Sequence, residues 1–176
     1  MADDASLMFL IDADHGQFYV QDVEPYDAWM AEHAMDPGLP PAGWTEEAVH
    51  VHRIGVEPHS ISVGTARDDM VESLIAIHAS RPTTEPTAEH VVEADLAAPT
   101  GQLTISSPGV HPEDGPIMTV PAGLLRARVS YIPSGPPAVD TNGGPGGHFL
   151  YRIDLWPTDE ARGLVVLRQG PNPWGG

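Results

Sequence analysis

Apolar and polar residues alternate with a period of two along most of this chain, in short runs separated by glycine, proline, asparagine or aspartate. This pattern is typical of an antiparallel sandwich or barrel, because successive strand residues point to opposite faces. We expect strands over residues 7–11, 17–20, 71–78, 89–96, 102–106, 148–156 and 163–168, with two more between 117 and 131. About eight or nine strands suffice for two packed sheets, so the predicted fold is mainly β, an antiparallel β-sandwich with one or two short helices.

Two turns are expected to form hairpins. The segment 12–16 separates the first two strands, and Gly16 can adopt the positive φ that a tight turn needs. The segment 121–123 joins the two strands between 117 and 131. Each pair of strands is therefore expected to lie side by side in one sheet.

Charged residues occupy one face of two predicted strands. Arg126 and Arg128 alternate with apolar residues and are expected to face outward. In the strand 89–96, one face carries three carboxylates, which we expect to meet water or a partner: Glu89, Glu93 and Asp95.

Helix is a minor component, with residues 26–35 and 45–49 as the best candidates. The second candidate opens with Thr45 and two glutamates, at the end where the helix dipole favours negative charge. The stretch 136–147 is so rich in glycine and proline that we expect a loop. It lacks the lysine of a phosphate-binding loop.

The length of 176 residues, 41% of them hydrophobic, suits a single core. We expect one domain over residues 1–176, with 1–5 and 170–176 as loose termini. The absence of cysteine excludes disulfides, thiol nucleophiles and thiolate metal sites. No run approaches the roughly 20 apolar residues of a membrane span, and the start lacks secretory-signal features, so a cytoplasmic protein is expected.

Charge narrows the function further. The chain has no lysine, and its first basic residue, Arg53, follows eleven carboxylates. Eight arginines against 25 acids give a net charge of -17. Nucleic acids and anionic membranes need clustered cations, so neither is an expected partner. The composition favours a partner that is itself a basic protein.

The acid-rich first third also contains two tryptophans, and aromatic anchors beside a charged rim are common in protein interfaces. The alternative is that both tryptophans pack a helix or loop onto the sandwich. The candidate partner-binding residues are Asp12, Asp14, Asp22, Glu24, Asp27, Trp29, Trp44, Glu46, Glu47, Glu89, Glu93 and Asp95.

A histidine cluster offers an enzymatic alternative. His50 and His52, with Glu57 and His59, have ligand types suited to a divalent metal, and their spacing resembles the first metal motif of the cupin barrels. The second cupin motif is not matched, because Arg126 stands where its histidine belongs. If the helix at 45–49 continues through His52, the two histidines diverge by about 200°. We therefore expect no metal and no cofactor.

The segments Trp44–Val49, Ser60–Val63, Gly101–Ser106, Val120–Gly123 and Arg128–Tyr131 together resemble the competence protein J (ComJ) family, in order and spacing over residues 8–156. This resemblance implies a small bacterial β-sandwich that inhibits a nuclease acting as DNA enters the cell. It implies no particular inhibitor residues. The chain departs from the family in an insertion at 37–41, the glycine-rich loop at 142–147 and the C-terminal Trp174.

Three functions remain open from the sequence. The first is a non-catalytic, acidic binding protein that inhibits a basic partner such as a nuclease. The second is a cupin-like metal-dependent enzyme that uses His50, His52 and Glu57. The third is a structural protein without a defined partner, which predicts acids spread evenly over the surface.

Overall fold

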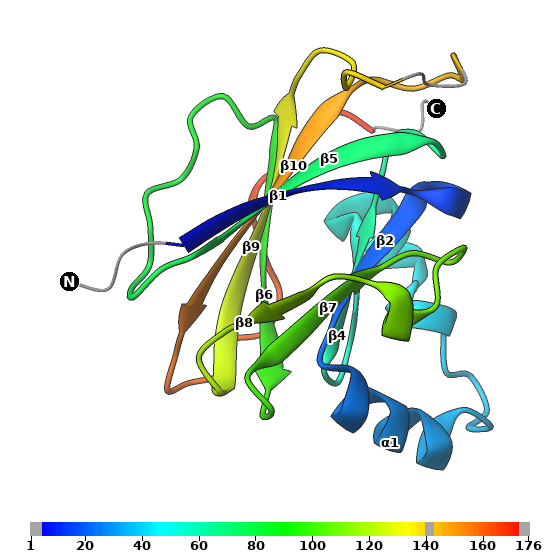
Figure 1. The fold of residues 1–176 in the computed structure, drawn as a ribbon, viewed down its shortest axis with the longest axis vertical. Helices are drawn as coiled ribbons and strands as arrows, with labels where there is room; N and C mark the ends of the chain where they lie inside the picture. Colours follow the sequence, from blue (N-terminus) through cyan, green and yellow to red (C-terminus); the bar gives the residue numbers. More distant parts are fainter. Residues whose placement is uncertain (1–4, 140–142, 173–176) are drawn as a thin grey trace.

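The protein folds as two facing β-sheets, which form a sandwich with little helix (Figure 1). The computed structural model describes residues 5–139 and 143–172. The six-stranded sheet has the order β1-β5-β10-β9-β6-β11, and the five-stranded sheet has the order β3-β4-β2-β7-β8. Neighbouring strands run antiparallel, except that β5 and β10 are parallel. The predicted sandwich is confirmed, with eleven strands in place of eight or nine.

The bounds of the elements are as follows. The strands are β1 Ala5–Asp12, β2 Gln17–Gln21, β3 Ile54–Glu57, β4 Ser60–Gly64, β5 Met70–Ile77, β6 His90–Ala98, β7 Gln102–Ser106, β8 Ile117–Thr119, β9 Gly123–Pro133, β10 Phe149–Pro157 and β11 Val165–Arg168. The helical segments are α1 Val23–His33, the short turns η1 Asp14–Gly16, η2 Pro41–Gly43 and η4 Pro112–Asp114, and the π-helical η3 Ala48–His52. None of the described helices is long and apolar enough to cross a membrane.

Both predicted hairpins are wrong, because each turn carries the chain from one sheet to the other. β1 pairs with β5 in the six-stranded sheet, whereas β2 pairs with β4 and β7 in the five-stranded sheet. Between them, Ala13 is fully buried and its N–H donates to the carbonyl of Asp69, which turns the chain into the core. β8 and β9 are likewise in different sheets. Strands that change sheets at a corner are common in sandwiches.

Tyrosines tie the two sheets together through the core. The Tyr131 hydroxyl on β9 lies 2.7 Å from the carbonyl oxygen of Arg53 and 2.6 Å from that of Gly64, both on the five-stranded side. On β10, the Tyr151 hydroxyl accepts from the Ala66 N–H at 2.8 Å. Burial raises the pKa of both phenols, so they stay neutral.

The outer face of the six-stranded sheet is covered around β6 and β9, contrary to the prediction that the carboxylate of Glu93 meets water or a partner. Arg126 and Arg128 on β9 are buried, as is Glu93 on β6, which is only 5% exposed. Glu93 lies 2.9 Å from Arg128, 3.4 Å from Arg126 and 3.2 Å from Arg81. One buried carboxylate therefore serves three guanidinium groups.

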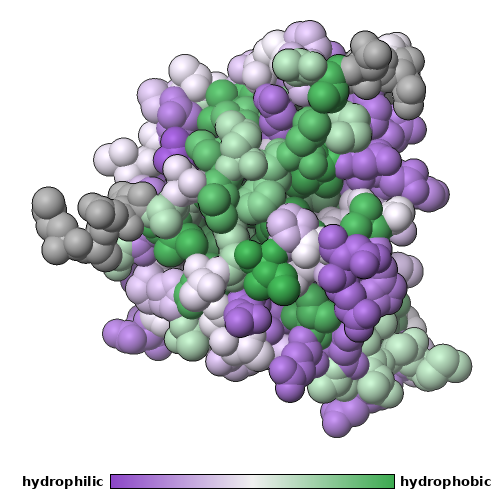
Figure 2. Space-filling model, viewed as in Figure 1, coloured by the Kyte–Doolittle hydropathy of each residue, from purple (hydrophilic) through white to green (hydrophobic). Residues whose placement is uncertain are grey.

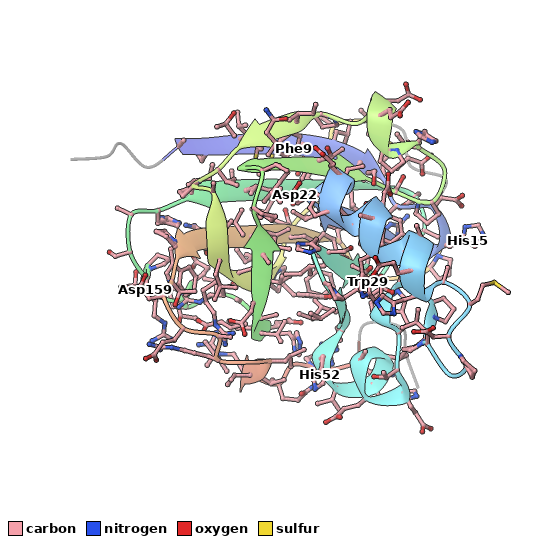
Figure 3. The ribbon with its side chains drawn as sticks, turned by 90° about the horizontal axis from the view of Figure 1, so that it is seen from below. Phe9, His15, Asp22, Trp29, His52 and Asp159 are labelled. Atoms are coloured by element: carbon pink, nitrogen blue, oxygen red, sulfur yellow. The ribbon has the colours of Figure 1, made fainter. Side chains whose placement is uncertain are left out.

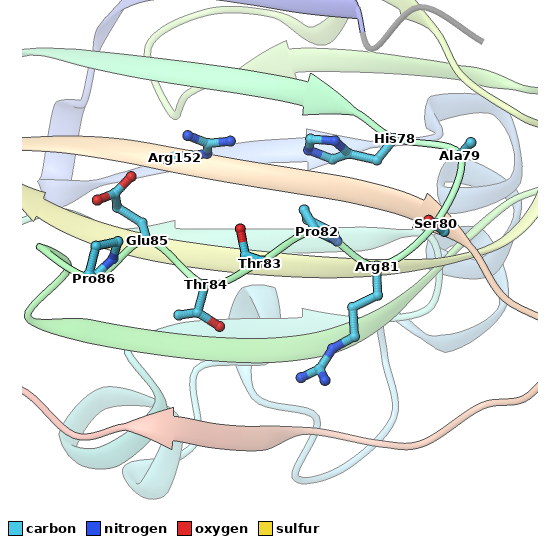
Figure 4. A pocket seen from close by; sticks show the side chains of 10 residues that line it. All are labelled: His78, Ala79, Ser80, Arg81, Pro82, Thr83, Thr84, Glu85, Pro86 and Arg152. Carbon is cyan, nitrogen blue, oxygen red and sulfur yellow. The ribbon is translucent and has the colours of Figure 1, made fainter. Parts of the chain in front are cut away.

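The segment 78–88 crosses this face and shields the cluster (Figure 4). The Arg128 guanidinium donates to the carbonyl of Pro82 at 2.9 Å, and its centre lies 5.2 Å from the ring of Trp156. A cavity of ≈ 420 Å³ remains beneath the segment, beside Arg152. Burial acts to raise the pKa of Glu93, but the hydrogen bonds from Arg128 and Arg81 outweigh it and lower that pKa.

Replacing this carboxylate by an amide (Glu93→Gln) is expected to lower the free energy of unfolding by about 3 kcal/mol, because buried guanidinium groups lose their counter-charge. Urea denaturation measures the difference. Glu89→Gln, an exposed position one residue before β6, is the matched control and is expected to change stability by no more than about 0.5 kcal/mol. Equal losses in the two variants would contradict the buried cluster.

Acid should remove the same contribution. The folded-state pKa of Glu93 lies below its ordinary value of 4.5, so its stabilisation is present above that pH and is lost as the pH falls through the folded-state pKa. Asp69, whose pKa is lowered by the hydrogen bonds from Arg67, acts in the same sense. We expect the unfolding free energy to decline below about pH 4.5 and to decline less in Glu93→Gln. Urea titrations down the pH scale that give parallel profiles for both proteins would refute this.

Candidate protein-binding groove

Arginine is distributed unevenly between the two sheets. No strand of the five-stranded sheet contains an arginine, and neither do residues 5–52 or 99–125, which supply β2, α1, β7 and β8. Arg53, which precedes β3, is buried and donates to the carbonyl of Gly170 at 2.6 Å. The acidic residues of segments 5–52 and 99–125 therefore have no arginine near them in the sequence.

The outer face of the five-stranded sheet is polar but almost uncharged. Gln21, Ser60 and Thr104 lie side by side on β2, β4 and β7, and Gln21 donates to the Ser60 hydroxyl at 3.0 Å. Their chain neighbours Val20, Ile61 and Ile105 are buried in the core. All three residues are buried, so these polar groups are largely covered within the protein.

α1 lies at one end of this sheet and is fixed at its first turn (Figure 3). Asp22, which precedes the helix, is 1% exposed and accepts hydrogen bonds from the N–H and hydroxyl of Thr100 at 2.9 and 2.7 Å. The Tyr26 hydroxyl donates to the buried carboxylate of Glu57 at 2.8 Å. Burial, followed by the Glu57 hydrogen bond, raises the pKa of Tyr26. Because no residue of α1 is itself buried, these polar contacts position the helix.

A groove of ≈ 450 Å³ separates the start of α1 from β7, β8 and η4, and we call it the acidic groove. Four carboxylates line it: Asp22, Glu24, Asp27 and Glu113. The remaining lining is Val23, Thr100, Gln102, Thr104, Pro112 and Ile117. Glu24 and Asp27 are exposed and three residues apart, so they project from the same side of α1. The groove combines negative charge with hydroxyl, amide and apolar surface.

Of the predicted partner-binding residues, the groove brings together only Asp22, Glu24 and Asp27. Asp12 and Asp14 lie at the far end of β1 and in η1, and Glu46 and Glu47 are exposed beside η3. The other predicted acids belong to the side of the six-stranded sheet: Glu93 and Asp95 lie on β6, and Glu89 directly precedes it.

Two of these sheet acids are occupied within the protein. Asp95 is half-buried and accepts from Arg126 at 2.9 Å and from the backbone N–H groups of Arg162 and Gly163. Glu93 is held by three arginines, as described above. Neither carboxylate is therefore available as the exposed charge that the strand pattern predicted.

Both predicted tryptophans are half-buried. Trp29 lies in the middle of α1 between Tyr26 and His33, with ring centroids 6.0 and 5.5 Å away. Trp44 donates its indole N–H to the side-chain oxygen of Gln17 at 2.7 Å. The indole of Trp44 thus helps to hold the 41–44 loop against β2.

The histidines do not form a cupin-like metal site. Residues 48–52 are helical, and His50 is exposed whereas His52 lies 3.5 Å from Glu47. His59 contacts the carbonyl of Ala97 through Nδ1 at 2.9 Å, and Glu57 is bonded by Tyr26. Within residues 5–139 and 143–172, no three His, Asp or Glu side chains are placed to hold a metal ion.

Sequence reasoning missed Glu113, Thr100 and Thr104. These residues lie more than 60 positions beyond the end of α1 along the chain, and the pairing of β2 with β7 brings them to it. Thr100 carries no motif that identifies it as the partner of a buried aspartate. The alternation of residues shows which face of a strand is buried, but it does not show which strand lies next to it in the sheet.

Two solved structures share this architecture. The first is the crystal structure of ComJ, inhibitor of the DNA degrading activity of NucA, from Bacillus subtilis. It aligns with a TM-score of 0.62 at 17% identity, over 89% of this chain and 100% of that chain. The chain has a ComJ-like fold. The second, crocagin biosynthetic gene J, aligns with a TM-score of 0.57 at 15% identity, over 89% of this chain and 99% of the other. No family model and no curated protein matches the chain.

Removing the buried aspartate before α1 (Asp22→Ala) is expected to destabilise the protein by about 1–3 kcal/mol, because the Thr100 donors lose their acceptor. Hydrogen exchange should also speed up along α1. Asp27→Ala, an exposed acid on the same helix, is the control and should leave exchange of the α1 amides unchanged. If both variants exchange alike, Asp22 does not anchor the helix.

Proposed function

We propose that this protein is a non-catalytic inhibitor that binds a basic protein, of the class of DNA-degrading nucleases, through the acidic groove. The observation that carries the proposal is the groove itself, where three exposed carboxylates, Glu24, Asp27 and Glu113, gather beside a sheet whose strands contain no arginine.

Electrostatic complementarity gives the proposal its mechanism. A nuclease holds DNA phosphates with clustered lysine and arginine, and a carboxylate-lined surface fits such a cluster. Long-range attraction by a net charge of -17 accelerates encounter, and the groove then fixes the orientation. In this complex Glu24, Asp27 and Glu113 accept hydrogen bonds from the partner's cations. Thr104 and Gln102 supply neutral contacts.

The fold supports the same class of function. ComJ is described as an inhibitor of the DNA degrading activity of NucA. At 17% identity the likeness concerns the fold, so the inhibitor function is our inference from the likeness and the charge together. The expected location of this activity is the cytoplasm.

A plasmid-degradation assay with a purified DNA-degrading nuclease of the same organism tests the proposal. We expect the protein to inhibit this nuclease and the double charge reversal Glu24→Arg with Asp27→Arg to weaken inhibition by about tenfold or more, because like charges then face each other. Asp159→Arg with Glu160→Arg makes the same change in net charge, at exposed positions after β10, and is the matched control.

The control separates local contact from overall charge. If both double variants lose inhibition equally, net charge matters and the groove does not. If the unaltered protein fails to slow degradation at any ratio to the nuclease, the inhibitor proposal is wrong. Added salt should slow association of the unaltered complex, since exposed charges are screened.

A further inference from the structure

The two sheets have four edge strands, and three of these edges are closed to further pairing. A free edge exposes unpaired N–H and C=O groups, so natural proteins shorten, bend or cover it. β8 has three residues and is flanked by Pro116 and Pro121. β11 has four residues and an irregular register between Val166 and Arg168.

The third closed edge, β3, is covered by the η2 segment. A Cβ atom added to Gly55 would lie 2.2 Å from the carbonyl oxygen of Ala42, so the loop backbone rests directly on this strand. In each of these three edge strands, a short length, flanking proline, an irregular register or a covering loop hinders the pairing of a further strand.

β1 has none of these protections. All eight residues pair in unbroken antiparallel register with β5 on one side, and no described strand pairs on the other. Its first seven residues, Ala5–Ile11, contain no charge and no proline. Leu7, Met8 and Leu10 are 49%, 57% and 46% exposed.

Both faces of this edge are apolar. Leu7 points to the same side as the core residue Ile75, whereas Met8 lies beside the half-buried Leu74 on the outer face. Apolar side chains gather in a band over this side of the molecule (Figure 2), where β1 lies nearest the viewer in Figure 1. An added strand would find unpaired backbone groups and apolar contacts on each face.

We propose that β1 is a strand-addition site for an extended segment of the basic partner, apolar in its middle and with lysine or arginine beyond the end that lies against Asp12. The strand ends in the exposed Asp12, followed by Asp14, and Glu72 lies beside Leu10 on β5. These carboxylates, all at the same end of β1, complement a cationic flank there. Main-chain hydrogen bonds would provide affinity and the alternate apolar contacts would provide register. This inference rests on the proposed function for the basic character of the partner.

Charge disfavours a second copy of this chain as the occupant. Two copies each carry a net charge of -17, and pairing of their β1 strands would bring two acid-flanked edges together. The same charge attracts a cationic segment.

A synthetic peptide tests the site without any nuclease. The probe has five alternating valines and threonines between two lysines at each end, and one control peptide carries a central proline while another has glutamates at its ends. We expect the lysine peptide to bind, to slow hydrogen exchange in residues 5–12, and to bind better than both controls. Leu10→Arg should weaken binding by about tenfold or more. Leu167→Arg, a 40% exposed position on the opposite edge strand β11, should not.

Binding without protection of β1, equal binding by Leu10→Arg, or no binding at all overturns the proposal. Sedimentation of the protein alone provides a further check. A concentration-dependent dimer that Leu10→Arg abolishes would assign this edge to a second copy. Because peptide binding and nuclease inhibition are measured separately, loss of inhibition with intact peptide binding would refute the inhibitor function and leave the strand-addition site standing.

Discussion

The shortage of cations is the constraint on which this structure depends. Eight arginines are the entire supply, and the side chains of seven bond to carboxylates or carbonyls within the protein. Glu93 alone engages three of them. A buried carboxylate without a partner would cost several kcal/mol, so the fold commits its arginines to the six-stranded sheet and the loops around it. The exposed carboxylates of the acidic groove, Glu24, Asp27 and Glu113, lie outside this arginine network.

This division separates stability from recognition. Arg128 holds the crossing segment 78–88 by donating to the carbonyl of Pro82. Arg53 donates to the carbonyl of Gly170, and Arg168 donates to the carbonyl of Ala88, just before β6. The α1 side is held by a few polar contacts, chiefly those of Asp22 and Tyr26, and keeps its exposed carboxylates for other molecules. A ComJ-like fold at 17% identity indicates that this sandwich tolerates wide changes in sequence.

The sequence predicted the fold class and most strands, because period-two alternation reports burial on one face. It also predicted α1, which begins three residues earlier than expected, and a helix at 45–49, which in the structure lies later, with a π-helical turn at Ala48–His52. It failed to predict which segments lie beside each other. The turns at 12–16 and 121–123 cross between sheets, and the segment 78–88 covers Arg126 and Arg128. Alternation cannot reveal that a distant loop lies over a strand, nor that Thr100 meets Asp22.

The inequality of the four sheet edges has a consequence for assembly. In polymer terms, a unit that can be extended at one position only is monofunctional, and a monofunctional unit terminates a chain instead of propagating it. With β3, β8 and β11 closed, this sandwich lacks the second open edge that a growing cross-β stack requires. An apolar strand that would otherwise be an aggregation hazard is thus tolerable in the native fold, because whatever joins it finds no further edge on the far side.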